Sequence, residues 1–176
     1  MMDQSFIPSE DVQNAAIQAL HTRGVRVEDI AQLTFFLQEA YIPGLTMEDC
    51  IESVRSVLKK REVQNALLTG IELDMLTEKE QLSSPLQQLI QKDESLYGVD
   101  EVLALSILNL YGSISFTNYG HIDKLKKGVL ETLNDKSTGA VHAFLDDLVG
   151  AIAAAASSRL AHRYRGELEH DIQSFS

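Results

Sequence analysis

The chain has 176 residues, of which 44% are apolar, and this length and composition fit one folded domain. Its 26 acidic and 15 basic residues give a net charge of -11, which argues against a nucleic-acid-binding protein and offers no basic patch to an anionic membrane. The single cysteine, Cys50, excludes an intrachain disulfide and a thiolate metal cluster. With no apolar signal segment and no transmembrane segment in view, we expect a cytoplasmic protein.

Helical signals recur along the chain, and no segment shows sustained two-residue alternation, which predicts an all-α protein. Ser9 and Thr46 are expected N-caps, and the acid three residues after Thr46 makes a weak capping box. The segment from Thr77 to Glu80 repeats this pattern, and Ser84 precedes a proline at an expected helix start. The helices expected in the first half run from about Ser9 to His21, Val27 to Ala40, Thr46 to Lys59 and Arg61 to Met75.

The second half is more apolar and ends in a run of small residues. We expect a buried helix from Asp100 to Leu110, a turn or loop from Phe116 to Gly120, and a short helix from Ile122 to Leu133 with a weak point at Gly128. Residues 134–139 form a polar break. The Ala-rich segment at 140–163 predicts a helix that its neighbours approach closely, and the polar tail beyond Gly166 is expected to fray.

These elements predict a single-domain helical bundle in which the small-residue helix at about 140–163 is central and the other helices surround it. We divide the chain into an N-terminal helical support or cap (1–83), a candidate catalytic helical region in the same compact domain (84–166) and a polar tail (167–176). An apolar helix face left uncovered would suit a homo-oligomer. The first part carries ordinary amphipathic helices, so we place the functional site in the second.

Carboxylates stand at the edges of the apolar segments in the second half. Hard divalent cations prefer oxygen ligands, and Mg²⁺ typically takes one or two carboxylates together with water and substrate phosphate. Carboxylates that converge from different helices would make such a site, and the metal would polarise a phosphoryl oxygen. The candidate residues are Asp93 with Glu94, Asp100 with Glu101, Asp123, and Asp146 with Asp147.

Two further side chains fit this chemistry. His142 lies four residues before Asp146, on the same face of the expected helix, where it would orient that carboxylate or donate a proton. Lys126 lies three residues after Asp123 and would contact a phosphate as a point charge.

Each of these functional assignments also has a purely structural alternative. Asp100 and Glu101 at a helix start would complement the helix dipole, and Asp123 with Lys126 would form an ordinary surface pair. His142, if it acts with no other group, would have only a structural role. Asp146 and Asp147 would instead pair with arginines such as Arg159 or Arg163.

The segment from Lys92 to Ala155 resembles the phosphatidylglycerophosphatase A family, in particular its soluble Gram-positive branch. The matching elements are KDESLYGVDEV at 92–102, HIDKLK at 121–126 and the segment from Gly139 to Gly150, with its Asp-Asp pair. The resemblance departs from the family pattern at Gly120, where members carry an arginine, and in lacking the early Gly/Pro-rich motif and the membrane spans. The acid and lysine positions of the family pattern correspond in this sequence, in order, to Asp93, Asp100, Glu101, Asp123, Lys126, Asp146 and Asp147.

The resemblance implies a Mg²⁺-dependent phosphatase that converts phosphatidylglycerophosphate to phosphatidylglycerol. On this hypothesis Asp100, Glu101, Asp123, Asp146 and Asp147 bind the metal, and Lys126 binds the substrate. The catalytic candidates are Asp100, Asp146 and His142. The partner is then a phosphate ester, including phospholipid met at the membrane surface. Two alternatives remain open: a helical binding or regulatory module without catalysis, and a phosphatase of a soluble phosphate ester.

Overall fold

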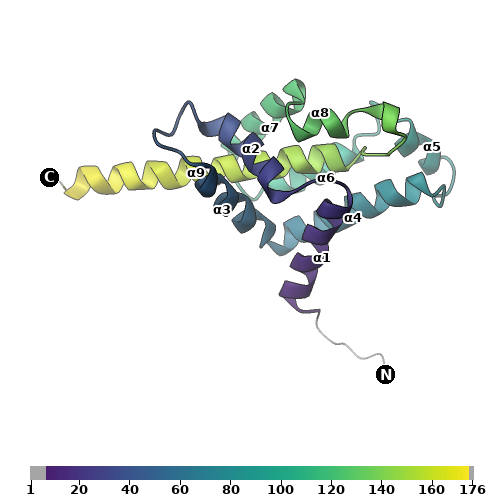
Figure 1. Ribbon diagram of the computed structural model, residues 1–176, viewed down its shortest axis with the longest axis horizontal. Helices are drawn as coiled ribbons and strands as arrows, with labels where there is room; N and C mark the ends of the chain where they lie inside the picture. The colour runs from purple at the N-terminus through teal and green to yellow at the C-terminus, as the bar shows by residue number, and fades with distance from the viewer. Residues whose placement is uncertain (1–6, 175–176) are drawn as a thin grey trace.

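The structure, a computed structural model, describes residues 7–174, with the side chains of residues 7–170. Within this range the chain forms nine α-helices and one short 3-10 helix, and it has no strand (Figure 1). The α-helices are α1 (Ser9–Thr22), α2 (Val27–Gln38), α3 (Met47–Leu58), α4 (Arg61–Glu78), α5 (Leu86–Gln91), α6 (Val99–Leu108), α7 (Ser113–Leu125), α8 (Val129–Leu133) and α9 (Leu145–Ser174), with the 3-10 helix at Lys136–Thr138.

Helix α9 is the centre of the bundle, as the sequence predicts. It contacts α2, α3, α4, α6, α7 and α8. The segment from Ala151 to Ala156 is fully buried, because its small side chains let neighbouring backbones approach closely. Two hydroxyls use this proximity: Thr34 donates to the carbonyl of Ala153 at 3.4 Å, and Ser53 donates to that of Ala156 at 2.9 Å. The all-α bundle with a central small-residue helix is therefore confirmed.

Helix boundaries in the first half follow local capping chemistry in part. Thr46 caps α3 as expected, and its hydroxyl accepts from the N–H of Asp49 at 3.2 Å. The prediction of Ser9 as N-cap is wrong, because Pro8 occupies that position. The Thr77 pattern does not start a helix either. Instead α4 continues to Glu78, and the Thr77 hydroxyl donates to the carbonyl of Leu73 inside the helix.

The expected loop at 116–120 is also wrong, because these residues lie within α7. Polar side chains of α7 bind neighbouring groups instead: Asn118 donates to the hydroxyl of Ser157 on α9 at 2.7 Å, and the buried Ser115 hydroxyl donates to the carbonyl of Leu108 at 2.9 Å. The predicted interruption of the helix near Gly128 is confirmed. Helix α7 ends at Leu125, Lys126 adopts a left-handed conformation with φ 44°, and α8 follows Gly128.

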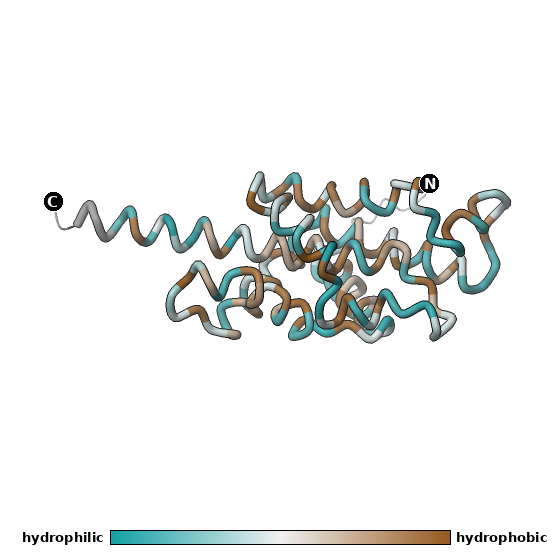
Figure 2. The backbone as a smooth tube through the Cα atoms, turned by 90° about the horizontal axis from the view of Figure 1, so that it is seen from above, coloured by the Kyte–Doolittle hydropathy of each residue, from teal (hydrophilic) through white to brown (hydrophobic). Residues whose placement is uncertain are grey.

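Both ends of α9 differ from the expected range. The helix begins at Leu145 rather than near residue 140, so residues 140–144 form a non-helical approach to it. It continues to Ser174 rather than fraying after Gly166, and its last turns extend beyond the bundle in both views (Figures 1 and 2). An ion pair between Arg165 and Glu169 at 3.0 Å spans one turn of this extension. Among the described residues, no helix has the combined length and apolarity that crossing a bilayer requires.

Candidate active site

A pocket of about 270 Å³ opens where the first turn of α9 meets the start of α6 and the end of α7. Segments distant in sequence form its wall, and each of them except the one that contributes Asn134 carries at least one of the carboxylates that the sequence analysis selected. The structure therefore brings the predicted acids together. The charged lining residues are Asp93, Glu94, Asp100, Glu101, Asp123, Lys126, Asp146 and Asp147, and we refer to this site as the acidic pocket.

The backbone that carries Asp146 and Asp147 is held in place by a carboxylate from α4. Asp74 is fully buried, and it accepts hydrogen bonds from the N–H groups of Phe144 at 3.1 Å and Leu145 at 3.0 Å. These are N–H groups at a helix start, which have no partner within the helix and are stabilised by a carboxylate. Asp74 thereby determines where α9 begins and how Asp146 and Asp147 enter the pocket.

Lys126 is the cation among these acids. Its Nζ lies 2.6 Å from Asp123, 2.9 Å from Asp146 and 3.9 Å from Asp147. The left-handed backbone at Lys126 ends α7 at this point. The expected pair of Asp123 and Lys126 exists, but it extends inward to α9 and is more than a surface pair. Burial alone would lower the pKa of Lys126, but the Asp146 charge and the bonds to both acids raise it, so the ammonium stays charged.

One ammonium does not compensate the charge of the carboxylates around it. Burial, and after it the charge of Asp146, raises the pKa of Asp147 to about 8. Burial also raises the pKa of Asp146 and of Asp100, although Lys126 opposes the shift at Asp146 and an N–H bond from Glu101 opposes it at Asp100. Each of these carboxylates is more costly to ionise than in water, so the pocket would gain from additional positive charge.

The residues present fit a hard divalent cation in donor chemistry and in charge. The pocket offers carboxylate oxygens, which are the ligands that Mg²⁺ prefers. In this structure the carboxylates of Asp123 and Asp146 are spaced so that both contact the ammonium of Lys126. Within the part of the chain that the structure describes, no three or more His, Cys, Asp or Glu side chains are grouped closely enough to hold an ion.

His142 lies outside the acidic pocket. Because α9 begins only at Leu145, the predicted shared helical face of His142 and Asp146 is wrong. The Nδ1 atom of His142 instead lies 3.1 Å from the guanidinium of Arg23, and the imidazole lines a second, adjoining pocket. Burial, and then the Arg23 charge, lowers the pKa of His142, which keeps the ring neutral near pH 7.

Three side chains of the first half support this region, although the sequence analysis assigned none of them to the site. Arg23 from the end of α1 pairs with Glu78 of α4 at 2.6 Å and donates to the carbonyl of Val141 at 2.8 Å. Glu78 in turn accepts from the N–H of Val141 at 2.8 Å. With Asp74, these residues fix the approach to α9. One sequence signal was available for Asp74: it is an acid on the buried face of an otherwise amphipathic helix.

The arginines considered as partners of Asp146 and Asp147 bind elsewhere. Arg159 pairs with Glu52 at 3.0 Å, and Arg163 pairs with Asp49 at 3.1 Å, on the α3 side of α9. Asp93 has a cation of its own, Lys136, at 3.0 Å. The Asp146–Asp147 pair therefore faces the pocket without an arginine.

The fold and pocket define an all-helical protein in which carboxylates from several segments surround one lysine at the start of a buried helix. Residues 17–162 match the sequence model of the family described as Phosphatidylglycerophosphatase A. The chain belongs to this family.

Relatives of known sequence and structure agree with this assignment. The chain is 63% identical over 162 residues to the uncharacterized protein YutG of Bacillus subtilis (strain 168), which covers 89% of this chain and 98% of YutG. A solved structure of a protein of unknown function from Bacillus stearothermophilus has 65% identity and a TM-score of 0.85, covering 86% of this chain and 94% of that one. The low temperature requirement C protein of Listeria monocytogenes has 58% identity and a TM-score of 0.87, covering 90% and 99%.

Proposed function

We propose that this protein is a Mg²⁺-dependent phosphomonoesterase that hydrolyses phosphatidylglycerophosphate to phosphatidylglycerol. The observation that supports this proposal most strongly is the acidic pocket. Its carboxylates come from α6, α7, α9 and the segment before α6, and all face one space of about 270 Å³. Family membership supports phosphatase chemistry in general, and the lipid substrate follows from the description of the family.

In this proposal the metal is held by the acids that line the pocket. When bound, Mg²⁺ would neutralise carboxylate charge and polarise the phosphoryl oxygens. Lys126 contributes a point charge to the phosphate. Asp100, which faces the pocket from the first turn of α6, would take a proton from the attacking water while the bond between phosphorus and the alcohol oxygen breaks and the alcohol leaves. The proposed ligands are Asp100, Glu101, Asp123, Asp146 and Asp147.

Two alternatives have their own support. Lys126 already contacts Asp123 and Asp146 as a counter-ion would, which favours a binding or regulatory module that retained the fold without catalysis. The observation that no described helix could cross a bilayer is compatible with a soluble phosphate ester as the substrate.

The test is phosphate release from dispersed phosphatidylglycerophosphate with and without Mg²⁺. We expect release by the wild type that a chelator abolishes, and a loss of about 100-fold or more in kcat for Asp146→Asn, since a metal ligand and an organising charge are both removed. Asp11→Asn, which changes an exposed carboxylate on α1, is the matched control and should retain wild-type activity.

Metal binding should also be visible without turnover. A cation that binds only the folded state raises the thermal midpoint by mass action, so Mg²⁺ should stabilise the wild type and the Asp11→Asn control but not Asp146→Asn. A panel of soluble phosphate esters, assayed beside the lipid, separates the two phosphatase hypotheses. The absence of phosphate release from every ester, with no Mg²⁺-dependent midpoint shift, would leave the binding module as the function.

A further inference from the structure

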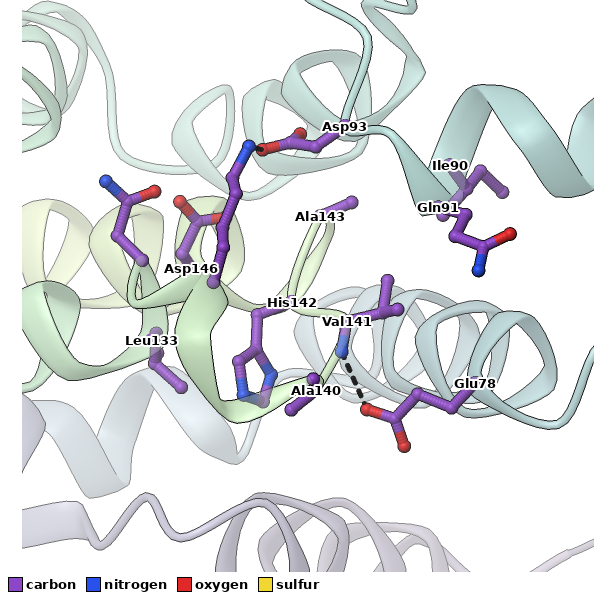
Figure 3. Close-up of a pocket in the computed structure, with 13 residues that line it drawn as sticks. Glu78, Ile90, Gln91, Asp93, Leu133, Ala140, Val141, His142, Ala143 and Asp146 are labelled. Carbon is purple, nitrogen blue, oxygen red and sulfur yellow. Dashed lines mark hydrogen bonds and ion pairs between the residues drawn. The ribbon is translucent and has the colours of Figure 1, made fainter.

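Asp146 and Asp147 are neighbours on α9, but their carboxylates have different surroundings. Asp146 accepts hydrogen bonds from Lys126 and from the N–H of Asp147, both at 2.9 Å, and it also lines the adjoining pocket (Figure 3). Asp147 lines only the acidic pocket. Within residues 7–170 its carboxylate accepts no hydrogen bond of normal distance and angle, and Lys126 lies 3.9 Å away. Because Asp147 is buried, its charge is costly without a donor beside it.

A second polar group without a partner lies on the facing helix α7. The hydroxyl of Tyr119 is buried and forms no hydrogen bond of normal distance and angle with any described residue. The ring packs against α9 at Gly150, where an added Cβ would lie 3.5 Å from the Cε2 atom of Tyr119. Gly150 follows Asp147 by three residues, so both lie on the same side of α9. Tyr119 is therefore placed beside the turn of α9 that carries Asp147.

The Tyr119 hydroxyl and the Asp147 carboxylate already influence each other. Burial raises the pKa of Tyr119, and after burial the charge of Asp147 raises it more than any other charge does. Hydrogen bonding to Asp147 adds to this shift, so the two groups are close although their geometry falls short of a normal hydrogen bond. The phenol keeps its proton near neutral pH and donates to a carboxylate. An unpaired donor thus faces an unpaired acceptor across the contact between α7 and α9.

We propose that Tyr119 is a positioning residue for Asp147, whose hydroxyl donates to one oxygen of that carboxylate while the other oxygen binds a divalent cation. The inference rests on the proposed function and adds a residue from α7 that supports the cation without contacting it. A carboxylate that binds a metal is oriented by a hydrogen bond to its remaining oxygen, and the loss of such a partner weakens metal binding.

The first test compares Tyr119→Phe, which keeps the ring and removes only the hydroxyl, with the wild type. In Mg²⁺-free buffer the thermal midpoint should rise by about 2–6 °C, because the fold no longer buries a hydroxyl that lacks a normal hydrogen bond. The Mg²⁺ affinity, measured by calorimetry, should fall about tenfold or more, the usual effect of removing a group that orients a metal ligand. A lower midpoint with an unchanged Mg²⁺ affinity would show that the hydroxyl has only a structural role.

Tyr111→Phe is the matched control. Tyr111 is also half-buried, and burial raises its pKa to about 12. It lies between α6 and α7 and does not line the acidic pocket. The control removes the same chemical group from a similar environment, so its Mg²⁺ affinity should equal that of the wild type.

The second test observes the hydroxyl directly by Raman spectroscopy. The intensity ratio of the tyrosine Fermi doublet depends on the hydrogen bonding of the hydroxyl, and the difference spectrum between the wild type and Tyr119→Phe isolates the doublet of Tyr119. Addition of Mg²⁺ should shift this ratio towards that of a hydrogen-bond donor. The doublet of Tyr111, isolated in the same way with the control variant, should not change.

The outcomes separate this inference from the proposed function. If Mg²⁺ raises the midpoint of the wild type but leaves the doublet of Tyr119 unchanged, or binds Tyr119→Phe equally well, the positioning role is overturned while the metal site stands. A weaker Mg²⁺ affinity together with a shifted doublet supports the role even if no phosphate ester is hydrolysed. If Mg²⁺ changes neither the midpoint nor the doublet of the wild type, both the metal site and the positioning role are wrong.

Discussion

Asp74 shows how one buried side chain controls the acidic pocket from a distance. It belongs to α4 and does not line the acidic pocket, yet it binds the N–H groups of Phe144 and Leu145, directly before Asp146. Complete burial makes its negative charge costly, and the two N–H bonds offset only part of that cost. The burial of Asp74 therefore lowers the stability of the fold, and its hydrogen bonds fix the residue at which α9 begins.

A prediction at this scale concerns pH. Burial raises the pKa of Asp74 to about 8, from 3.8 in an unperturbed aspartate. Between these values the folded protein holds a proton that the unfolded chain has released, so this carboxyl reduces the stability of the fold as the pH rises through that window. In denaturant titrations without metal, the wild type should lose more stability per pH unit than Asp74→Asn, by about 1 kcal/mol.

Asp11→Asn controls for the loss of a carboxylate elsewhere on the surface, and its profile should follow the wild type. Asp147, whose pKa burial also raises to about 8, contributes a slope of the same sign in all three proteins. Parallel profiles for the wild type and Asp74→Asn would show that Asp74 is ionised in the folded state at these pH values.

At the scale of elements, the close approach of α4 to α9 depends on Gly70. A Cβ at this position would lie 2.5 Å from Leu148 and 2.9 Å from the Cβ of Phe144, distances that real Cβ atoms do not tolerate. Phe144 carries one of the N–H groups that Asp74 binds. The contact between α4 and α9 and the capping of α9 are therefore parts of one arrangement, which only a residue without a side chain permits.

Gly70→Ala should be destabilising by about 1–3 kcal/mol in chemical denaturation, the usual cost of overpacking a core. It should also lower the proposed phosphatase activity, since Phe144 must move. The matched control is Gly120→Ala in α7, where a Cβ meets nothing within 4 Å, and the better helix propensity of alanine should raise stability by up to about 1 kcal/mol. A stabilised Gly70→Ala would show that α4 can move away from α9 at no cost.

At the scale of the whole molecule, α9 has two parts with different environments. Up to Leu160 it is the buried centre of the bundle, and Arg163 still pairs with Asp49 of α3. The side chains of residues 165–170 are exposed. The last turns of the helix extend past the other helices (Figure 2). The extension is held by exposed pairs such as Arg165–Glu169, which contribute little to stability. The bundle and the acidic pocket are complete without it.

Truncation tests this division. A chain that ends at Gly166 should keep its thermal midpoint within about 2 °C of the wild type, since the ion pairs that it loses among the described residues, Arg163–Glu167 and Arg165–Glu169, are exposed. A chain that ends at Ser158 loses the buried Leu160 and the Arg159–Glu52 pair, and its midpoint should fall by about 10 °C. Equal midpoints for the two truncations would mean that the buried part of α9 ends earlier than Leu160.

The amino-acid sequence by itself determined the helical class, the central position of the Ala-rich segment and which acids belong to the candidate site. These follow from signals that neighbouring residues carry, such as helix propensity, the Thr46 capping box and the ordered motifs of the family. The tertiary structure alone decided where α9 begins, that Lys126 rather than Arg159 meets Asp146, and that His142 faces Arg23. Those contacts join residues 20, 70 and 119 positions apart, and they arise because burial forces each charged group to find a partner from another helix, which no local pattern specifies.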